Sequence, residues 1–238
     1  MTDQRVAVVT GAAGGMGRAI VAALLGDGVQ VHGLDIDAGG LADMAQDGFT
    51  GHKVDLTEPA QIDAFFDTLD RLNILVNNAG TCLMSDFPDI PVDEFERQMS
   101  LNFSSMFHCT QAAVKLMLGG DGVRKIVNIS SNGAYNFDVF DPPHYRASKA
   151  AMDTLTKDLA RRYARDKICV NSIAPAMTET PLFGVLTEDV LAAAVAQMPH
   201  GAAMQPAQIA EWVRFLASPA GDVCSGNVIV LNQGRDVR

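Results

Sequence analysis

The feature that most constrains the fold is a β-branched apolar run at residues 5–10 that passes directly into a glycine-rich turn. A helical stretch follows at residues 19–25, and short apolar runs keep alternating with helical stretches along the chain. Strands joined in this way form βαβ units with right-handed crossovers, which build a buried parallel sheet. The pattern therefore predicts an α/β fold.

Six further runs are typical of strands: 29–34, 52–54, 74–76, 125–129, 169–173 and 227–231. The stretches typical of helices are 38–46, 59–69, 92–118 and 144–164. With 238 residues, 48% of them hydrophobic, the chain can bury one substantial core, and no linker, charge block or repeat divides it. We expect a single Rossmann-type doubly wound domain over 1–238, with a seven-stranded parallel sheet and helices on both faces. Such a sheet binds ligands at the carboxyl ends of its strands.

The formal net charge is −10, and an acidic surface repels nucleic acid and anionic lipid, so we expect neither as a partner. The first four residues lack the basic and apolar regions of a signal peptide, and no apolar run reaches the ~18 residues of a membrane span. These observations favour a cytoplasmic protein. The four cysteines form no CxxC pair, so free thiols are favoured over disulfides, and no metal-ligand spacing is present.

The turn at residues 10–17 (TGAAGGMG) has the chemistry of a dinucleotide site. Gly11, Gly15 and Gly17 follow the spacing GxxxGxG, which differs from the commoner GxGxxG. Glycine permits a tight turn and lets a pyrophosphate approach backbone N–H groups at a helix N-terminus. An isolated match would favour a loop without a ligand, but the strand before it and the helix after it favour a cofactor.

Asp35 stands where the second expected strand ends, and it indicates which nicotinamide cofactor binds. A carboxylate there accepts hydrogen bonds from the adenosine ribose and repels a 2′-phosphate. No arginine or lysine occurs at Ala12, Ala13 or Ile36 to pair with such a phosphate, although the sequence does not place the side chain of Arg18. We therefore expect NAD; a solvated loop aspartate is the alternative, and dual cofactor use stays open.

Tyr145 and Lys149 are one helical turn apart, so their side chains project from one face. The pKa of a free phenol, near ~10, is too high for an efficient base at neutral pH, and a nearby ammonium lowers it. Alone this spacing would indicate a surface pair. Downstream of a dinucleotide turn it predicts that Tyr145 exchanges the proton of a secondary alcohol while nicotinamide carries the hydride. Ser131, after the strand at 125–129, is expected to hold the substrate oxygen, although it could merely cap a strand end.

Together these residues resemble the NAD-dependent branch of the short-chain dehydrogenase/reductase family over essentially the whole chain. The motifs are TGxxxGxG at 10–17, NNAG at 77–80, Asn102, NISS at 128–131, YxxxK at 145–149, and NSIAP at 171–175 followed by Thr180. The resemblance implies a tetrad of Asn102, Ser131, Tyr145 and Lys149, in which Asn102 supports a water relay toward Lys149. Asn102 could instead be only a helix-kink residue. The implied cofactor contacts are Gly11, Gly15, Met16, Gly17, Asp35, Ile36, Asp55, Leu56, Asn78, Ala79, Gly80, Tyr145, Lys149, Pro175, Met177, Thr178 and Thr180.

The sequence departs from the family pattern in four places. Gly133 comes one residue early after Ser131, and Ala176 replaces the usual glycine after Pro175. Ala202 stands where many members have arginine, and residues 232–234 (NQG) replace the common DGG. The last two departures are expected to affect packing or subunit contacts and to leave the chemistry unchanged.

Residues 178–204, rich in Leu, Ala, Met and Phe, correspond to a helical lid over the substrate in this family. The candidate substrate residues are Ser131, Tyr145, Met84, Phe137, Phe140, Met177, Leu182, Phe183 and Leu186; plain core or oligomer packing is the alternative for each apolar one. Such a pocket would be apolar, and Asp138 and Asp141 nearby disfavour an anion. We expect a small neutral alcohol or ketone as substrate, and the resemblance implies a homotetramer.

Three other classes of protein compete with a dehydrogenase or ketone reductase. A non-catalytic NAD(H)-binding sensor of the same fold usually loses the tyrosine or the lysine, and this chain keeps both. A P-loop hydrolase is excluded because no glycine-rich loop ends in Gly-Lys-Ser/Thr. A dehydratase or epimerase of the same fold stays open.

Overall fold

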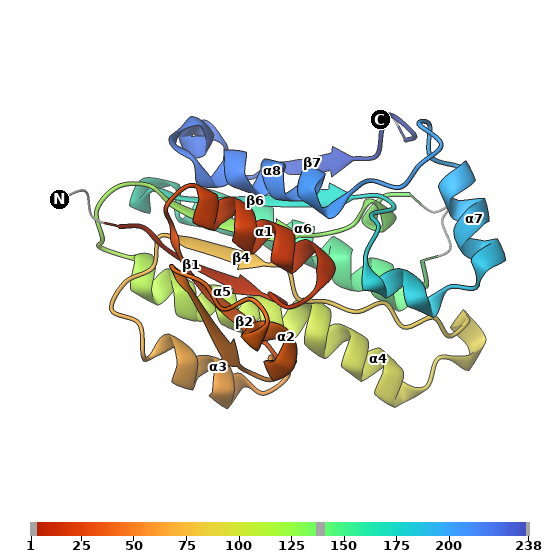
Figure 1. Ribbon diagram of the computed structural model, residues 1–238, viewed down its shortest axis with the longest axis horizontal. Coiled ribbons are helices and arrows are strands. Elements are labelled where there is room, and N and C mark those ends of the chain that lie inside the picture. Colours follow the sequence, from red (N-terminus) through yellow and green to blue (C-terminus); the bar gives the residue numbers. More distant parts are fainter. Residues whose placement is uncertain (1–3, 137–140, 237–238) are drawn as a thin grey trace.

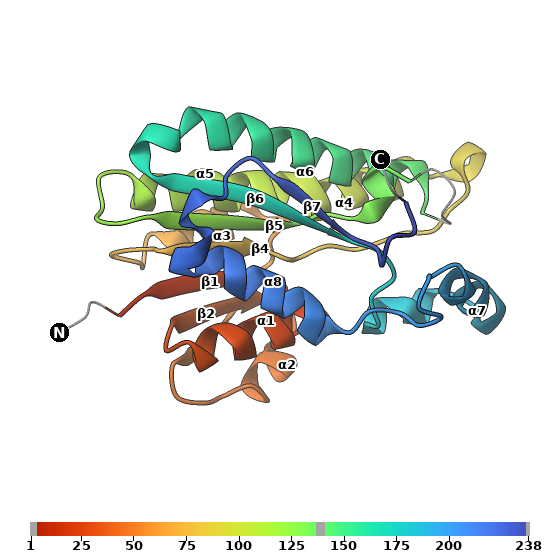
Figure 2. The same cartoon turned by 90° about the horizontal axis from the view of Figure 1, so that it is seen from above.

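The structure is a computed structural model that describes residues 4–136 and 141–236, apart from the side chains of Leu182 and Val185. Seven strands form one parallel sheet in the order β3-β2-β1-β4-β5-β6-β7 (Figures 1 and 2). They are β1 (Val6–Thr10), β2 (Gln30–Asp35), β3 (Phe49–Lys53), β4 (Ile74–Asn77), β5 (Arg124–Ile129), β6 (Ile168–Pro175) and β7 (Val228–Leu231). The strand order reverses between β1 and β4, which confirms the predicted doubly wound sheet.

The helices are α1 (Gly15–Gly26), α2 (Ala38–Ala42), α3 (Pro59–Phe66), α4 (Val92–Met99), α5 (Ser105–Met117), α6 (Pro143–Arg162), α7 (Glu188–Ala196) and α8 (Pro206–Ala217). In Figure 2, α4, α5 and α6 cover one face of the sheet, and α1 and α8 cover the other. The central strands are buried on both faces, which explains why their sequences are continuous apolar runs.

The core consists of two layers, one on each face of the sheet. Ala7 and Val9 of β1 pack in the layer under α1 and α8, whereas Val6 and Val8 pack in the layer under α3 and α5. This alternation is the period-two pattern of a strand, which turns successive side chains to opposite faces. Because the strands are parallel, the carboxyl ends of β1, β4, β5 and β6 lie at the same edge of the sheet.

Several element boundaries differ from the sequence expectations. The expected helix at 92–118 is two helices joined by a π turn at Ser100–Ser104, and β3 begins at Phe49, ahead of the expected 52–54. α1 begins at Gly15 and not at residue 19, so the glycines of the turn form its first helical turn. We expected no helix at the position of α8. Its start is nevertheless marked in the sequence by a Gln205–Gln208 capping box and a proline in the first turn.

The segment after β6 leaves the sheet and crosses the carboxyl ends of the strands. It forms a short 3₁₀ turn (Pro181–Val185) and then α7, which lies beyond the strand ends in both views (Figures 1 and 2). A bridge between Thr178 and Met204 closes the segment at its base. Within the part of the chain that the structure describes, no helix combines the length and apolar character needed to cross a membrane.

Candidate functional site

The glycine turn connects β1 to α1 in a conformation that only glycine fits. Gly11 has φ +63°, and a Cβ there would lie 2.9 Å from the Cα of Ala79. A Cβ at Gly17 would collide with the carbonyl oxygen of Gly11. No side chain caps the N-terminus of α1 among the described residues, so backbone N–H groups of its first turn face the cleft.

Thr10 ties the turn to the end of β4, the neighbouring strand. Its hydroxyl oxygen accepts the backbone N–H groups of Asn78 and Ala79, each at 3.0 Å. The amide of Asn78 donates in return to the carbonyl oxygens of Thr10 and Gly11, also at 3.0 Å. The two strand ends on either side of the switch point are thereby held at a fixed separation.

The carboxylate of Asp35 is fixed at the end of β2. One oxygen accepts the N–H of Ala13 at 2.9 Å, and the other accepts the N–H of Asp37 at 3.0 Å. The structure also places Arg18, which the sequence left open. Its guanidinium donates to the carbonyl oxygens of Ala13 at 2.8 Å and Gly40 at 2.9 Å, so backbone oxygens already engage this cation.

A cleft of about 790 Å³ runs along the carboxyl ends of β1, β2 and β4. The expected cofactor residues that line it are Gly11, Gly15, Met16, Asp35, Ile36, Asp55, Leu56, Asn78, Ala79, Gly80 and Thr180. Gly17 lies beneath the turn, and Lys149 is buried behind the cleft, so neither lines it. Tyr145, Pro175, Met177 and Thr178 line an adjoining cavity. A long cleft with free N–H groups at one helix N-terminus fits a dinucleotide.

Sequence reasoning missed the wall that α4 contributes to this cleft. Asp93, Glu96 and Arg97 line it, together with Ser100 in the π turn. These residues belong to no motif; Gln98 of α4 bonds the backbone of Thr81 and Leu83 in the loop after β4, which holds the helix beside the cleft. Two carboxylates therefore stand in the same cleft as Asp35.

Tyr145 and Lys149 lie on α6, as the spacing predicted, with the Lys149 Nζ 5.9 Å from the centre of the Tyr145 ring. The ammonium donates to the carbonyl oxygen of Ile129 at 2.8 Å, which fixes it against the end of β5. Ser131, two residues further along, shares a hydrogen bond with Tyr145 and accepts the N–H of Gly133 at 3.0 Å. The structure thus brings the expected tyrosine, lysine and serine together.

The electrostatics of this pair are dominated by burial. Burial raises the pKa of Tyr145, and Asp141 and Cys82 add to the rise, while the hydrogen bond with Ser131 opposes it. Burial lowers the pKa of Lys149 to about 8, which the charges of Asp153 and Cys82 oppose. We expected Lys149 to lower the pKa of Tyr145, but the pKa is raised, and the charges that act on it are those of Asp141 and Cys82.

Asn102 lies in the π turn and is fully buried. Its side-chain oxygen accepts the N–H of Thr81 at 2.8 Å, and its amide donates to the Thr81 carbonyl at 2.9 Å and to the Ser148 hydroxyl at 3.1 Å. The residue therefore joins the loop after β4 to the helix that carries Tyr145. A π turn inside a helix often marks a functional position, and here it turns the amide inward.

Asp153 is a buried carboxylate that sequence reasoning missed, although it stands one helical turn after Lys149. It is 2% exposed, and one of its oxygens accepts the hydroxyls of Ser130 at 2.9 Å and Tyr135 at 2.6 Å. Burial raises the pKa of Asp153, and these hydrogen bonds oppose the rise. The spacing from Lys149 on α6 was the available signal.

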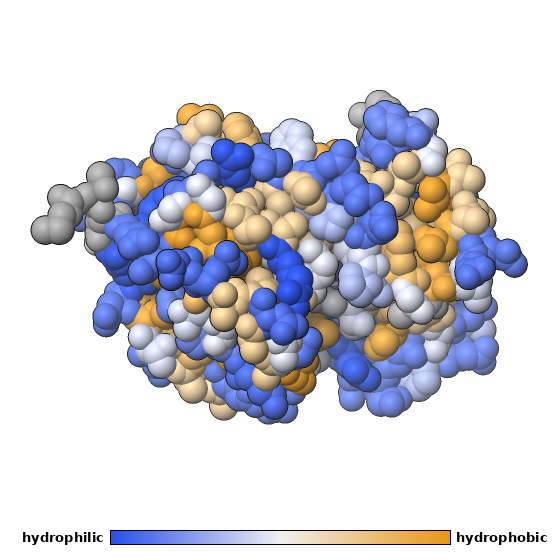
Figure 3. Space-filling model, viewed as in Figure 1, coloured by the Kyte–Doolittle hydropathy of each residue, from blue (hydrophilic) through white to orange (hydrophobic). Residues whose placement is uncertain are grey.

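The second cavity adjoins the cleft and has a volume of about 140 Å³. Tyr145, Ser131, Met84, Met177, Phe183 and Leu186, all expected at the substrate, line it. Met16 and Thr180 line both spaces, so the cavity and the cleft meet. Phe137, Phe140 and Asp138 lie outside the described residues, as does the side chain of Leu182. Figure 3 shows apolar side chains gathered on the surface where α7 lies.

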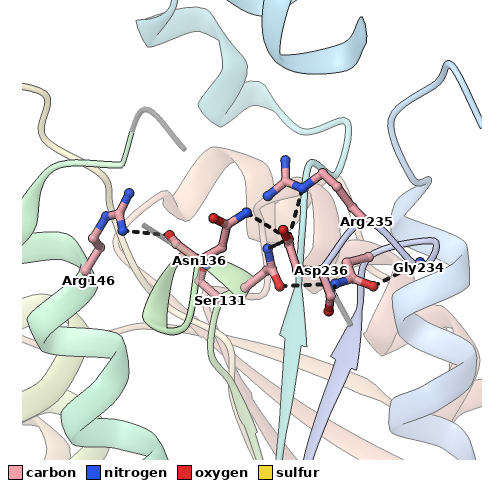
Figure 4. Close-up of polar contacts among 9 residues, drawn as sticks. Ser131, Asn136, Arg146, Gly234, Arg235 and Asp236 are labelled. Atoms are coloured by element: carbon pink, nitrogen blue, oxygen red, sulfur yellow. Dashed lines mark hydrogen bonds and ion pairs between the residues drawn. The ribbon is translucent and has the colours of Figure 1, made fainter. Parts of the chain in front are cut away.

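The last described residues reach the same cavity, which the sequence did not suggest. Asp236 accepts the side-chain amides of Asn132 at 2.9 Å and Asn136 at 2.8 Å, and the Nε of Arg235 at 3.0 Å (Figure 4). Arg235 itself lines the cavity. The NQG segment, for which we expected only packing or subunit contacts, is thus followed directly by a cation that lines the same cavity as Tyr145. No group of three or more potential metal ligands occurs among the described residues.

Comparisons with known proteins agree with this geometry. A family model described as enoyl-(acyl carrier protein) reductase matches residues 11–236. A 3alpha-hydroxysteroid dehydrogenase from Mediterraneibacter gnavus is 33% identical over 245 residues, covering 96% of each chain. An acetoacetyl-CoA reductase from Acinetobacter sp. is 33% identical over 247 residues and 98% of each chain.

Solved structures show the same similarity in three dimensions. The 3-ketoacyl-(acyl-carrier-protein) reductase from Brucella melitensis, complexed with NADH, has a TM-score of 0.90 at 25% identity over 98% of each chain. The Pseudomonas aeruginosa RhlG/NADP active-site complex has a TM-score of 0.90 at 30% identity, covering 98% of this chain and 97% of that one. The family contains oxidoreductases that act on CH–OH groups and bind a nicotinamide cofactor. The chain belongs to the short-chain dehydrogenase/reductase family.

Proposed function

We propose that the protein is an NAD-dependent oxidoreductase that interconverts a small secondary alcohol and the corresponding ketone. One observation carries the proposal: Tyr145, Ser131 and the buried Lys149 stand where a dinucleotide-sized cleft meets a small cavity. A cavity of about 140 Å³ is close to the ~150 Å³ that holds benzene in another protein, so it suits one ring or a short chain.

In the proposed mechanism Tyr145 is the general acid and base. As the phenolate it takes the proton of the alcohol during oxidation, and as the neutral phenol it returns a proton to the carbonyl oxygen during reduction. Ser131, which already shares a hydrogen bond with Tyr145, donates to the same substrate oxygen and holds it in place. When bound, the nicotinamide accepts or supplies the hydride.

Lys149 supplies the positive charge behind Tyr145. In the protonated state its ammonium stabilises the phenolate and can hold the nicotinamide ribose while it stays bonded to the Ile129 carbonyl. Asn102 keeps the Thr81 loop against α6 and supports a water relay that reprotonates the lysine. Each of these groups is held by a hydrogen bond to the fold, which limits the reorganisation needed during catalysis.

The charges in the cleft support NAD over NADP. Asp35 at the end of β2 repels a 2′-phosphate, and Arg18 is engaged by two backbone carbonyls. Four carboxylates in all (Asp35, Asp55, Asp93 and Glu96) line the cleft against one lining cation, Arg97, so the balance of charge there is negative. We expect kcat/KM with NADH to exceed that with NADPH by at least about tenfold, since one unpaired charge contact is worth ~1.4 kcal/mol or more. Equal values for the two cofactors would contradict this part of the proposal.

Exposed apolar side chains support assembly into a homotetramer. Val92, Phe95 and Phe107 are 74%, 47% and 40% exposed on α4 and α5, and Trp212 and Phe215 are both 41% exposed on α8. Two separate apolar surfaces on one chain fit an assembly with two kinds of interface. Light scattering should give four times the 25.3 kDa chain mass.

The four free cysteines support a cytoplasmic location, which cell fractionation would test.

The direct test follows the absorbance of reduced nicotinamide with NAD and a panel of small neutral secondary alcohols, with Tyr145→Phe as the matched variant. Losing the proton-transfer group should lower kcat by about 10²–10⁴-fold while NADH still binds. A variant that retains full turnover would refute the assignment of Tyr145. Tight NADH binding without turnover of any alcohol or ketone would favour the non-catalytic sensor.

A further inference from the structure

We propose that Arg235 is a specificity-determining residue that binds a second, neutral carbonyl oxygen of the substrate, away from the carbon that is reduced. The substrate would then be a ketone that also carries an ester, thioester or other acyl carbonyl. This inference rests on the proposed ketone reduction and assigns a new role to a residue outside the tetrad.

The first support is the environment of the Arg235 side chain. It lines the cavity of Tyr145 and Ser131 and is only 10% exposed. Its Nε donates to Asp236 at 3.0 Å, but neither Nη atom has a hydrogen-bond partner among the described residues. A guanidinium carries five donors, and neither Nη atom is among the buried atoms that lack a partner in the described part of the chain, so both keep contact with the open cavity. A ligand oxygen in the cavity would satisfy them.

The second support is the rigidity of this cation. Asp236 accepts N–H groups from Arg235, Asn132 and Asn136 at once, and Figure 4 shows the three donors converging on its carboxylate. The Asn232 amide adds a bond to the Asp236 carbonyl at 3.1 Å. Asn132 directly follows Ser131, so the same carboxylate positions the guanidinium and the loop that holds the reacting oxygen. A binding group fixed relative to the catalytic groups is what substrate discrimination requires.

The third support concerns the charge of the ligand. Asp141 also lines the cavity, and the charge of Arg235 acts on it, although no ion pair joins them among the described contacts. With Asp236, which already pairs with Arg235, two carboxylates face one guanidinium, so this end of the cavity has no net positive charge. A substrate carboxylate would gain from Arg235 but be repelled by Asp141, whereas a carbonyl oxygen accepts from Arg235 without that repulsion.

The test compares two ketones of equal chain length, methyl acetoacetate and 2-hexanone, with NADH. The wild-type protein should favour methyl acetoacetate in kcat/KM. Arg235→Met keeps the length of the side chain but removes the donors, and should reduce that preference by about 10- to 100-fold, the range expected for a hydrogen bond to a charged group. Arg235→Lys should retain part of the preference, and Arg162→Met, an exposed arginine on α6, should leave it unchanged.

Binding measurements separate this inference from the proposed function. In Tyr145→Phe with NADH, calorimetry should show tighter binding of methyl acetoacetate than of 2-hexanone, and adding Arg235→Met should abolish the difference. Turnover of both ketones with an unchanged preference in Arg235→Met would overturn the role of Arg235 and leave the proposed function intact. Arginine-dependent binding of methyl acetoacetate without turnover by the wild-type protein would support the site and refute the ketone reductase.

Discussion

Asp153 should control the pH range in which the active site works, because it is the buried carboxylate nearest in sequence to Lys149 on α6. Burial lowers the pKa of Lys149 to about 8, and the negative charge of Asp153 acts to raise it. Asp153→Asn removes that charge, so the pKa of Lys149 should fall further. The lysine would then lose its proton, and the site its positive charge, at a lower pH than in the wild-type protein.

The size of the effect follows from the titration of Lys149. An opposite charge at close range typically shifts a pKa by about one to three units. With a loss of about one unit, roughly a quarter of the lysines stay protonated at pH 7.5, compared with about three quarters in the wild-type protein. Activity should therefore fall about threefold at pH 7.5 and change by only about a tenth at pH 6, where both lysines are charged.

The assay is the pH dependence of kcat/KM between pH 5.5 and 9.5. Asparagine is a suitable replacement because its oxygen can accept the hydroxyls of Ser130 and Tyr135 as the carboxylate does. Asp158→Asn, on an exposed part of the same helix, is the control. The prediction is refuted if the pH above which kcat/KM declines is unchanged and kcat/KM falls equally at every pH. Asp153 would then act only as a structural residue.

Gly17→Ala should weaken NADH binding by more than about tenfold, measured by calorimetry, because its Cβ would collide with the Gly11 carbonyl. Gly26→Ala, at the open end of the same helix, is the control and should bind normally. Burial holds the pKa values of His32 and His52 below 6.5, so the unfolded chain binds more protons and stability should fall as pH drops below about 6.5. His52→Gln should narrow the difference in Tm between pH 7.5 and pH 5.5 by on the order of 1–2 °C; an unchanged difference would exclude this pair as the cause.

The sequence predicted those parts of the fold and site that are determined by residues close together in the chain. The alternation of strands and helices predicted the doubly wound sheet. Gly11 and Gly17 are required by the backbone of one turn, and Tyr145 and Lys149 are neighbours on one helix. In each case a few consecutive residues carry the whole physical reason.

The parts that could not be predicted depend on contacts between distant segments. Asp236 bonds Asn132 and Asn136 across 104 and 100 positions, and no local pattern announces such a contact. Arg235 donates to the same carboxylate and lines the cavity of Tyr145, which is also far from it in the sequence. The lid expected at 178–204 stays a prediction, since its position beyond the strand ends does not show that it closes.

The π turn at Ser100–Ser104 has a consequence for how this chain can vary. A π turn takes up one more residue than an α turn, so removing one residue there would restore a regular α-helix and leave the direction in which α5 faces the sheet nearly unchanged. Cys109 and Ala113 would keep their places in the core, but Asn102 would be turned away from Thr81. A single-residue deletion should therefore preserve the fold and break the link between the loop after β4 and the helices, so the extra residue serves the site and not the stability of the chain.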